Sequence, residues 1–160
     1  MLIDSKRYFY FISAIIILAL LSIVMYQKYQ ISLGKNVVTI VTGAGSVKID
    51  VEYADTPEKQ TKGLMNRATL GKLSGMLFIF PEEKTRSFWM KNVVFPIDVM
   101  FISSNGRINE TTTLEPCPKD ADACPTYDSK ESAQYVIEVN AGFTQKNKII
   151  EGDILEISGF

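Results

Sequence analysis

The stretch Val47-Lys48-Ile49-Asp50-Val51-Glu52-Tyr53 decides the fold class of this chain. Its apolar side chains alternate with charged ones, which is the period of two expected for a β-strand with one buried and one solvent-facing side. Further short apolar runs follow, and we expect strands at residues 75–80, 86–91, 97–103, 107–113, 134–140 and 153–158. Short strands at this spacing predict a mainly β domain of the α+β class, folded as a small antiparallel barrel or sandwich of about seven or eight strands.

Two local signals indicate how the strands are connected. The pair Asn105-Gly106 lies between two expected strands and predicts a hairpin with a type I′ turn, in which both residues have positive φ. One short helix is expected after the first strand, because Asp55 or Thr56 can cap it and Pro57 suits its first position.

A different kind of segment lies near the N-terminus. From Tyr8 to Tyr26 the only polar side chains are Ser13, Ser22 and the tyrosine hydroxyls. At about 1.5 Å per residue, a helix of this length roughly spans the ~30 Å hydrocarbon layer of a bilayer. We therefore expect one transmembrane helix, since a buried core helix would need a much larger protein around it.

A cleaved signal peptide is the alternative, because Lys6 and Arg7 precede the apolar run. The run is long for a signal peptide and residues 27–30 offer no small-residue cleavage pattern, so we expect an uncleaved signal-anchor at the cell membrane, with the rest of the chain outside the cytoplasm. The expected organisation is a short tail at residues 1–7, the transmembrane helix at 8–26, a linker at 27–36 and an extracytoplasmic β-rich domain at 37–160.

The charge balance narrows the classes of partner. The chain has 17 basic and 18 acidic residues, of which residues 1–36 hold four and one, so the remainder holds 13 and 17 and has a net charge of −4. A mildly acidic domain without a basic run argues against nucleic acid as a partner. The partners we expect are the membrane, through the N-terminal helix, and a small polar ligand or envelope component.

The two cysteines indicate the compartment. Cys117 and Cys124 bracket a short segment rich in proline and other turn formers, which predicts a disulfide formed in an oxidising environment. The alternative is a thiolate pair for a metal or for redox chemistry, but the spacing is not Cys-x-x-Cys and no histidine is present to complete a site.

The absence of histidine restricts the chemistry further. A chain with no histidine has no Ser-His-Asp or Cys-His site and no imidazole metal ligand. We expect no cofactor, and any catalysis would depend on carboxylates, Lys, Tyr, Cys or Met.

Several blocks of the sequence occur in an ordered series, at residues 51–58, 62–67, 75–80, 88–92, 96–98, Cys117, 124–127 and 151–153. Together they resemble domain of unknown function family 192. The resemblance implies a compact β-rich domain that is secreted or tethered by one N-terminal segment, and it implies no activity or catalytic residue. Val93 departs from the family pattern, in which a Thr commonly follows the Trp-Met-Lys-Asn block.

The densest group of chemically useful side chains lies in residues 88–98, which include the only Trp of the chain. On a strand, Trp89 and Lys91 share one side, so the segment is neither wholly core nor wholly surface. A structural account makes Trp89 part of the core and Asn92 part of a turn. The functional account makes the segment the rim of a cleft for a small polar ligand such as a sugar. Its ligand-binding candidates are Trp89, Lys91, Asn92, Asp98, Asp55 and Arg67.

Two other functions are weighed against this binding role. Met65 and Met90 are the thioether pair to consider for a Cu(I)-binding protein, although methionine is also ordinary core filler. A hydrolase of envelope carbohydrate would need two carboxylates, for which Asp55 and Asp98 are the first pair to test. Whether the protein is an enzyme stays open, and we favour a non-catalytic binding or envelope-associated module.

Overall fold

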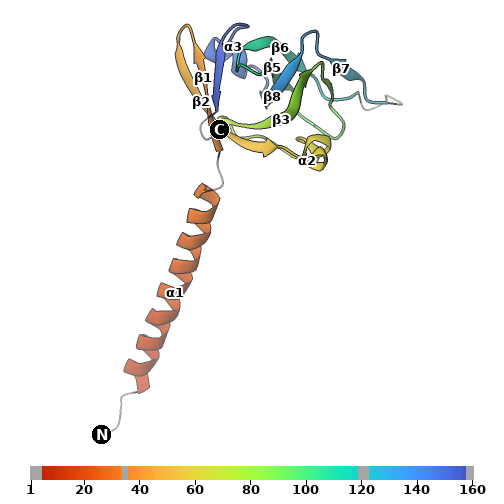
Figure 1. The fold of residues 1–160 in the computed structure, drawn as a ribbon. Helices are drawn as coiled ribbons and strands as arrows, with labels where there is room; N and C mark the ends of the chain where they lie inside the picture. The colour runs from red at the N-terminus through yellow and green to blue at the C-terminus, as the bar shows by residue number, and fades with distance from the viewer. Residues whose placement is uncertain (1–4, 34–35, 119–122, 158–160) are drawn as a thin grey trace. The chain divides into compact units, whose positions relative to one another are not determined.

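The computed structural model describes residues 5–33, 36–118 and 123–157, and the chain divides into two units, residues 1–35 and 36–160. The first unit is helix α1 (Ser5–Leu33) and the second is a β-rich domain (Figure 1). Helix α1 occupies most of the segment expected to be a linker, because the first Gly or Pro after Tyr26 is Gly34 and nothing earlier interrupts a helix.

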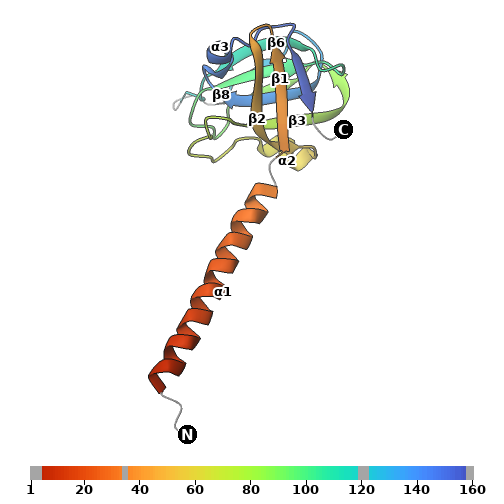
Figure 2. The same ribbon diagram turned by 90° about the vertical axis from the view of Figure 1, so that its left-hand side faces the viewer.

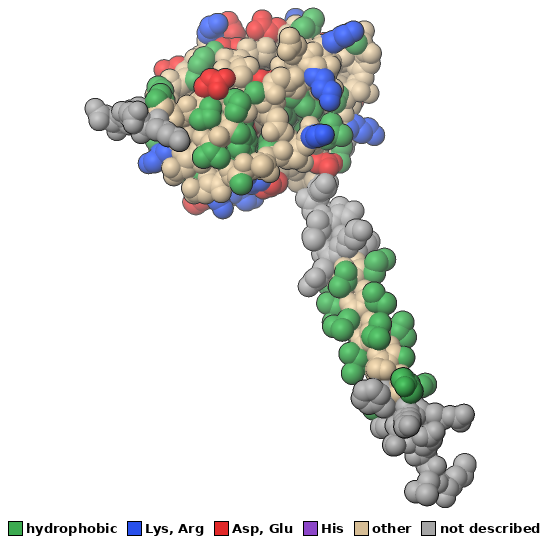
Figure 3. All heavy atoms as spheres, turned by 180° about the vertical axis from the view of Figure 1, so that it is seen from behind, with side chains coloured by type: hydrophobic (Ala, Val, Ile, Leu, Met, Phe, Trp, Pro, Cys, Tyr) green, Lys and Arg blue, Asp and Glu red, His purple; other side chains and the backbone are tan. Residues whose placement is uncertain are grey.

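The described side chains of helix α1 are almost all apolar and exposed. They include Tyr10, Leu18 and Met25, which are 66–69% exposed, and Figure 3 shows apolar side chains along the described part of the helix. Within the part of the chain that the structure describes, no helix has both the length and the apolarity needed to cross a membrane.

The domain is built on a seven-stranded sheet with the strand order β6-β5-β8-β3-β2-β1-β9 (Figures 1 and 2). All neighbouring strands are antiparallel except β2 and β3, which are parallel and connected through helix α2. Strands β4 and β7 form a second, two-stranded antiparallel sheet. The elements are β1 (Asn36–Thr42), β2 (Gly45–Ala54), α2 (Pro57–Lys62), β3 (Ser74–Lys84), β4 (Ser87–Trp89), β5 (Ile97–Ile102), β6 (Ile108–Leu114), β7 (Thr126–Asp128), β8 (Ala133–Asn140), α3 (Phe143–Asn147) and β9 (Ile154–Ile157).

The two edges of the large sheet meet at one end, so the sheet curls into a half-barrel. Arg107 and Ile154 form a β-bridge, and the Leu155 N–H donates to the Gly106 carbonyl at 2.7 Å. Gly106 has φ of 84°, and a Cβ there would lie 2.6 Å from the Leu155 carbonyl oxygen. This position therefore requires glycine both for its backbone conformation and for the close approach of β9.

Two hydrophobic clusters lie on the two faces of the large sheet. The inner cluster takes residues from all seven strands, among them Ile49, Leu77 and Ile137. The outer cluster includes Phe78 and Val136, the alternate residues of β3 and β8. Helix α2, the segment after it and the β4–β7 sheet cover the outer cluster, and this covering layer carries the candidate site.

The mainly β fold with few short helices is confirmed, and the helix expected after the first strand is α2. Its N-cap is Thr56, whose hydroxyl oxygen accepts the Lys59 N–H, and Pro57 is its first residue. Nine strands are described rather than seven or eight, because β1 and β7 were not expected, and the short helix α3 was not expected either.

The type I′ turn predicted at Asn105-Gly106 is wrong. Of the two residues only Gly106 has positive φ, and its N–H donates to the Ser103 carbonyl at 3.0 Å. The Asn105 side-chain oxygen accepts from the Ser103 hydroxyl and from the Arg107 N–H, so local side-chain bonds select a longer loop with a register shift in the hairpin.

Candidate functional site

Strand β4 separates a buried aromatic residue from an exposed one. Phe88 packs edge-on against Phe78 and Phe101, with ring centroids 5.1 and 5.8 Å away, and is buried in the outer cluster. Because successive side chains of a strand point to opposite sides, Trp89 faces away from that cluster and is 41% exposed. The pairing of Trp89 with Thr126 in β7 fixes the backbone of Trp89 on this surface.

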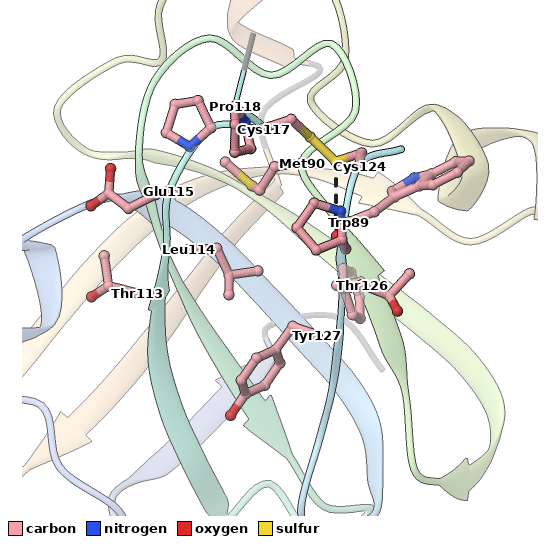
Figure 4. A pocket seen from close by; sticks show the side chains of 13 residues that line it. Trp89, Met90, Thr113, Leu114, Glu115, Cys117, Pro118, Cys124, Thr126 and Tyr127 are labelled. Atoms are coloured by element: carbon pink, nitrogen blue, oxygen red, sulfur yellow. Dashed lines mark hydrogen bonds between the residues drawn. A yellow bond between two sulfur atoms is a disulfide. The ribbon is translucent and has the colours of Figure 1, made fainter. Parts of the chain in front are cut away.

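The first hollow beside Trp89 has a volume of about 350 Å³, and we call it the disulfide pocket (Figure 4). In Figure 4 the segment Thr113 to Glu115 lies on one side of this pocket and Thr126 and Tyr127 lie on the other, with the disulfide at one end. Its lining is mostly apolar, which is the usual character of a small-molecule pocket. The lining residues are Phe88, Trp89, Met90, Thr113, Leu114, Glu115, Pro116, Cys117, Pro118, Cys124, Pro125, Thr126 and Tyr127.

A hydrogen-bonded pair closes the other end of this pocket. The Tyr127 hydroxyl donates to the buried carboxylate of Glu110, which also accepts the Lys130 N–H at 2.8 Å. The bond to Glu110 raises the pKa of Tyr127, because the hydroxyl is held as a donor. Tyr127 is thereby fixed as a floor between β6 and β7.

The second hollow shares Trp89, Cys117, Pro118 and Cys124 with the disulfide pocket and has a volume of about 400 Å³; we call it the Lys91 hollow. The Lys91 ammonium is 5.1 Å from the centroid of the Trp89 ring, a cation–π distance. Asn92 has φ of 56°, and its carbonyl accepts the Asn66 N–H at 2.8 Å, so a turn places its side chain at the surface. The described residues that line the hollow are Trp89, Lys91, Asn92, Cys117, Pro118, Ala123 and Cys124.

The cysteine pair forms a wall common to both hollows. Cys117 and Cys124 are joined by a disulfide, with their Cα atoms 5.3 Å apart, and both line both hollows. The disulfide therefore fixes the shape of the site in addition to closing the loop.

The β-rich domain matches a known family of proteins. The model of the DUF192 family, described as "Uncharacterized ACR", matches residues 38–157. The chain belongs to the DUF192 family. This confirms the resemblance drawn from the sequence, and the family carries no assigned activity.

Relatives of this DUF192 chain are themselves uncharacterised. A UPF0127 protein of Pyrococcus furiosus is 29% identical over 121 residues, which cover 72% of this chain and 93% of the relative. A UPF0127 protein of Thermococcus gammatolerans is 32% identical over 107 residues, which cover 66% and 64% of the two chains.

Solved structures share the fold. A crystal structure from Sinorhizobium meliloti, of a protein named as a suggested transcription regulator, has a TM-score of 0.68 and 36% identity, and covers 79% of this chain and 95% of that one. A protein of unknown function from Novosphingobium aromaticivorans has a TM-score of 0.68 and 30% identity, and covers 75% and 83%.

Three of the six ligand-binding candidates lie together in the DUF192 domain. Trp89, Lys91 and Asn92 line the Lys91 hollow, whereas the other three lie elsewhere. Arg67 donates to both carboxylate oxygens of Glu52 at 2.5 and 2.7 Å, and this pairing lowers the pKa of Glu52. Asp55 is exposed and bonds to Lys59 at 2.6 Å, which lowers the pKa of Asp55.

Asp98 is a structural residue rather than part of the cleft. It is 1% exposed, and its carboxylate accepts from the Thr113 hydroxyl at 2.8 Å and from the N–H and hydroxyl of Thr144 at 2.9 and 2.7 Å. It thus ties β5 to β6 and to helix α3. The expectation that Asp98 joins Trp89 at one site is wrong, because the Asp98 side chain is buried and fully occupied.

The residue pairs named for the two other functions also separate. Asp55 follows β2 and Asp98 lies in β5, with β3 and β8 between these strands, so the carboxylate pair does not meet at one site. Met65 lines a hollow beside α2, while Met90 is buried in the outer cluster and lines the disulfide pocket. Among the described residues, no group of three or more His, Cys, Asp or Glu side chains could hold a metal ion.

Sequence reasoning missed one unusual group, the carboxyl of Glu138 in β8. It is 5% exposed, and its Oε2 atom has no hydrogen-bond partner. Burial raises the pKa of Glu138 to about 8, although the nearby charge of Arg67 acts in the opposite direction. The sequence signal that could have indicated this group is the position of Glu138 as a single acid within the apolar run 136–139.

Proposed function

We propose that this DUF192 domain is a non-catalytic binding module whose ligand is a small polar molecule of the sugar class, held at Trp89. The observation that carries the proposal is the exposed Trp89, which lines both hollows, with Lys91 and Asn92 beside it in one of them. An aromatic ring offers an apolar face for the C–H side of a sugar ring, and ammonium and amide groups bond to its hydroxyls.

The composition of the two hollows supports binding rather than catalysis. Their charged lining residues, within the described chain, are Glu115 and Lys91. Glycoside hydrolysis by the common route requires two carboxyl groups on either side of the scissile bond, and this lining supplies one. The apolar floor of the disulfide pocket would accept a non-polar substituent of the ligand.

Trp89 provides a direct test, because it is the only tryptophan and its fluorescence reports on this site alone. We expect N-acetylglucosamine or glucose to change Trp89 emission saturably and to give a matching heat in calorimetry. Lys91→Ala should weaken the response, whereas Lys146→Ala, an exposed lysine on α3, should not. Unchanged emission and no heat with these sugars would overturn the proposal.

We further propose that helix α1 holds the domain at the cell membrane, with the domain outside the cytoplasm. The support is the apolar sequence of residues 8–26, the exposure of its described side chains and the disulfide of the domain, which suits an oxidising compartment. Membrane fractions should retain the full chain after alkaline carbonate washing, and external protease should reach the domain in spheroplasts. Release by carbonate, or protection of the domain, would contradict this.

A further inference from the structure

We infer that the site at Trp89 is the middle of a longer groove that binds a linear, uncharged oligosaccharide. This inference rests on the proposed function, and it adds the length and charge of the ligand. It follows from the arrangement of the hollows in the layer that covers the outer cluster.

The groove continues from Trp89 toward helix α2 through two more hollows. An aromatic hollow of about 330 Å³ lies next to Trp89 and is lined by Phe80, Phe88 and Thr61, among others. A helix hollow of about 490 Å³ follows it, beside α2. Pro57 and Thr61 line both, so these two hollows adjoin each other.

Trp89 connects this half of the groove to the other half. Its side chain lines the aromatic hollow, the disulfide pocket and the Lys91 hollow. The four hollows are therefore linked through shared lining residues from α2 across β4 to the disulfide, with the exposed indole where three of them meet, and we call this linked set the row. A single sugar ring would occupy one part of this row, whereas a chain of rings can contact it throughout.

The charges along the row indicate an uncharged ligand. Its described lining contains two acidic residues, Glu58 and Glu115, and two basic residues, Lys62 and Lys91. The signs balance, so no stretch of the row offers the run of basic side chains that a polyanion requires.

The elements that line the α2 half of the row favour a saccharide over a peptide. An extended peptide gains most of its affinity by pairing its backbone with a strand edge. Along the α2 half of the row the wall is helix α2, which offers no strand edge for such pairing and lines the row with Glu58, Thr61 and Lys62. Stacking on Trp89 and hydrogen bonds to Thr61, Asn66 and Asn92 suit a chain of sugar rings.

The test is a titration of the full-length protein with saccharides of increasing length, followed by Trp89 fluorescence. The probes are β-1,4-linked oligomers of N-acetylglucosamine and of glucose, from one to six units. We expect the affinity to rise at least tenfold from the monosaccharide to the tetramer, which corresponds to about 1.4 kcal/mol.

Two variants test where on the surface the gain in affinity with saccharide length arises. Thr61→Arg should fill the groove at the shared wall of the two α2 hollows, and it should remove the gain in affinity from the monosaccharide to the tetramer. Thr69→Arg is the matched control, since Thr69 is exposed and lines none of the four hollows.

Each outcome decides a separate question. If monosaccharides bind but affinity does not depend on length, the groove is refuted and the proposed function stands. If no saccharide alters Trp89 emission or gives heat in calorimetry, both the groove and the proposed function fail. If a tryptophan-free proline-rich peptide binds in place of the saccharides, the ligand class is wrong.

Discussion

Replacement of Glu138 by glutamine should make the stability of this protein less dependent on pH. The Glu138 carboxyl is buried, its Oε2 atom has no partner, and burial raises its pKa to about 8 from an ordinary value of 4.5. Glutamine has nearly the same shape and does not ionise, so Glu138→Gln removes the titration while retaining the packing.

The direction of this pH effect follows from how tightly the folded and unfolded states bind the Glu138 proton. Because the folded protein holds the Glu138 proton more tightly than the unfolded chain, this group favours folding fully below pH 4.5, and the benefit is lost as the pH rises through about 8. A pKa difference of this size corresponds to about 5 kcal/mol at most. The stability of Glu138→Gln relative to the natural protein should therefore increase by a few kcal/mol between pH 4.5 and pH 8.5.

Equilibrium urea unfolding, followed by Trp89 emission and far-ultraviolet circular dichroism at several pH values, measures this difference. Glu156→Gln, which changes an exposed acid in β9, is the matched control and should follow the natural protein at every pH. If Glu138→Gln also runs parallel to the natural protein from pH 4.5 to pH 8.5, then Glu138 does not retain its proton on folding and the reasoning is refuted.

Three further changes test other parts of the structure. Asp98→Ala should lower the free energy of unfolding by about 3 kcal/mol in urea titrations, because three hydrogen bonds to a buried carboxylate are lost, whereas Asp55→Ala, which removes an exposed ion pair, should change it little. Gly106→Ala should clearly lower the melting temperature, because alanine disfavours the positive φ of this position and its Cβ would clash with the Leu155 carbonyl oxygen. Gly43→Ala should not lower it, because no atom lies within 4 Å of a Cβ added at Gly43. Replacing both disulfide cysteines by serine should lower the free energy of unfolding by about 2 kcal/mol, because the loop they close is short, and should also weaken saccharide binding. An unchanged saccharide affinity would show that the disulfide does not shape the binding site.

The strands of the domain could be predicted where the sequence is periodic. Residues 47–53 alternate cleanly and lie within β2, because one side of that strand packs into the inner cluster while the other carries charges. Strand β7 was missed, since its three residues have no period of their own and are held by pairing with β4, a contact between distant segments. The type I′ turn predicted at Asn105-Gly106 was wrong because the hydrogen bonds of the Asn105 side chain to Ser103 and Arg107 outweigh the preference of an Asn-Gly pair for that turn.

The candidate site was predictable only in part, for a similar reason. Trp89, Lys91 and Asn92 are near neighbours in the sequence, so their common location follows from local geometry. Asp98 is only a few residues further on, yet it points to the opposite face of the sheet, where Thr144 satisfies it. The walls made by the disulfide segment and by α2 depend on the tertiary fold, and no spacing in the sequence indicates them.

The most direct test of the groove is to map the binding surface by nuclear magnetic resonance. The full-length protein, labelled with ¹⁵N, would be titrated with the N-acetylglucosamine tetramer while its backbone amide signals are recorded. The account predicts saturable shifts at Trp89, Lys91, Asn92 and Thr61, and none around Asp98 and Thr144. Shifts that gather on helix α3, or no shifts at millimolar tetramer, would contradict it.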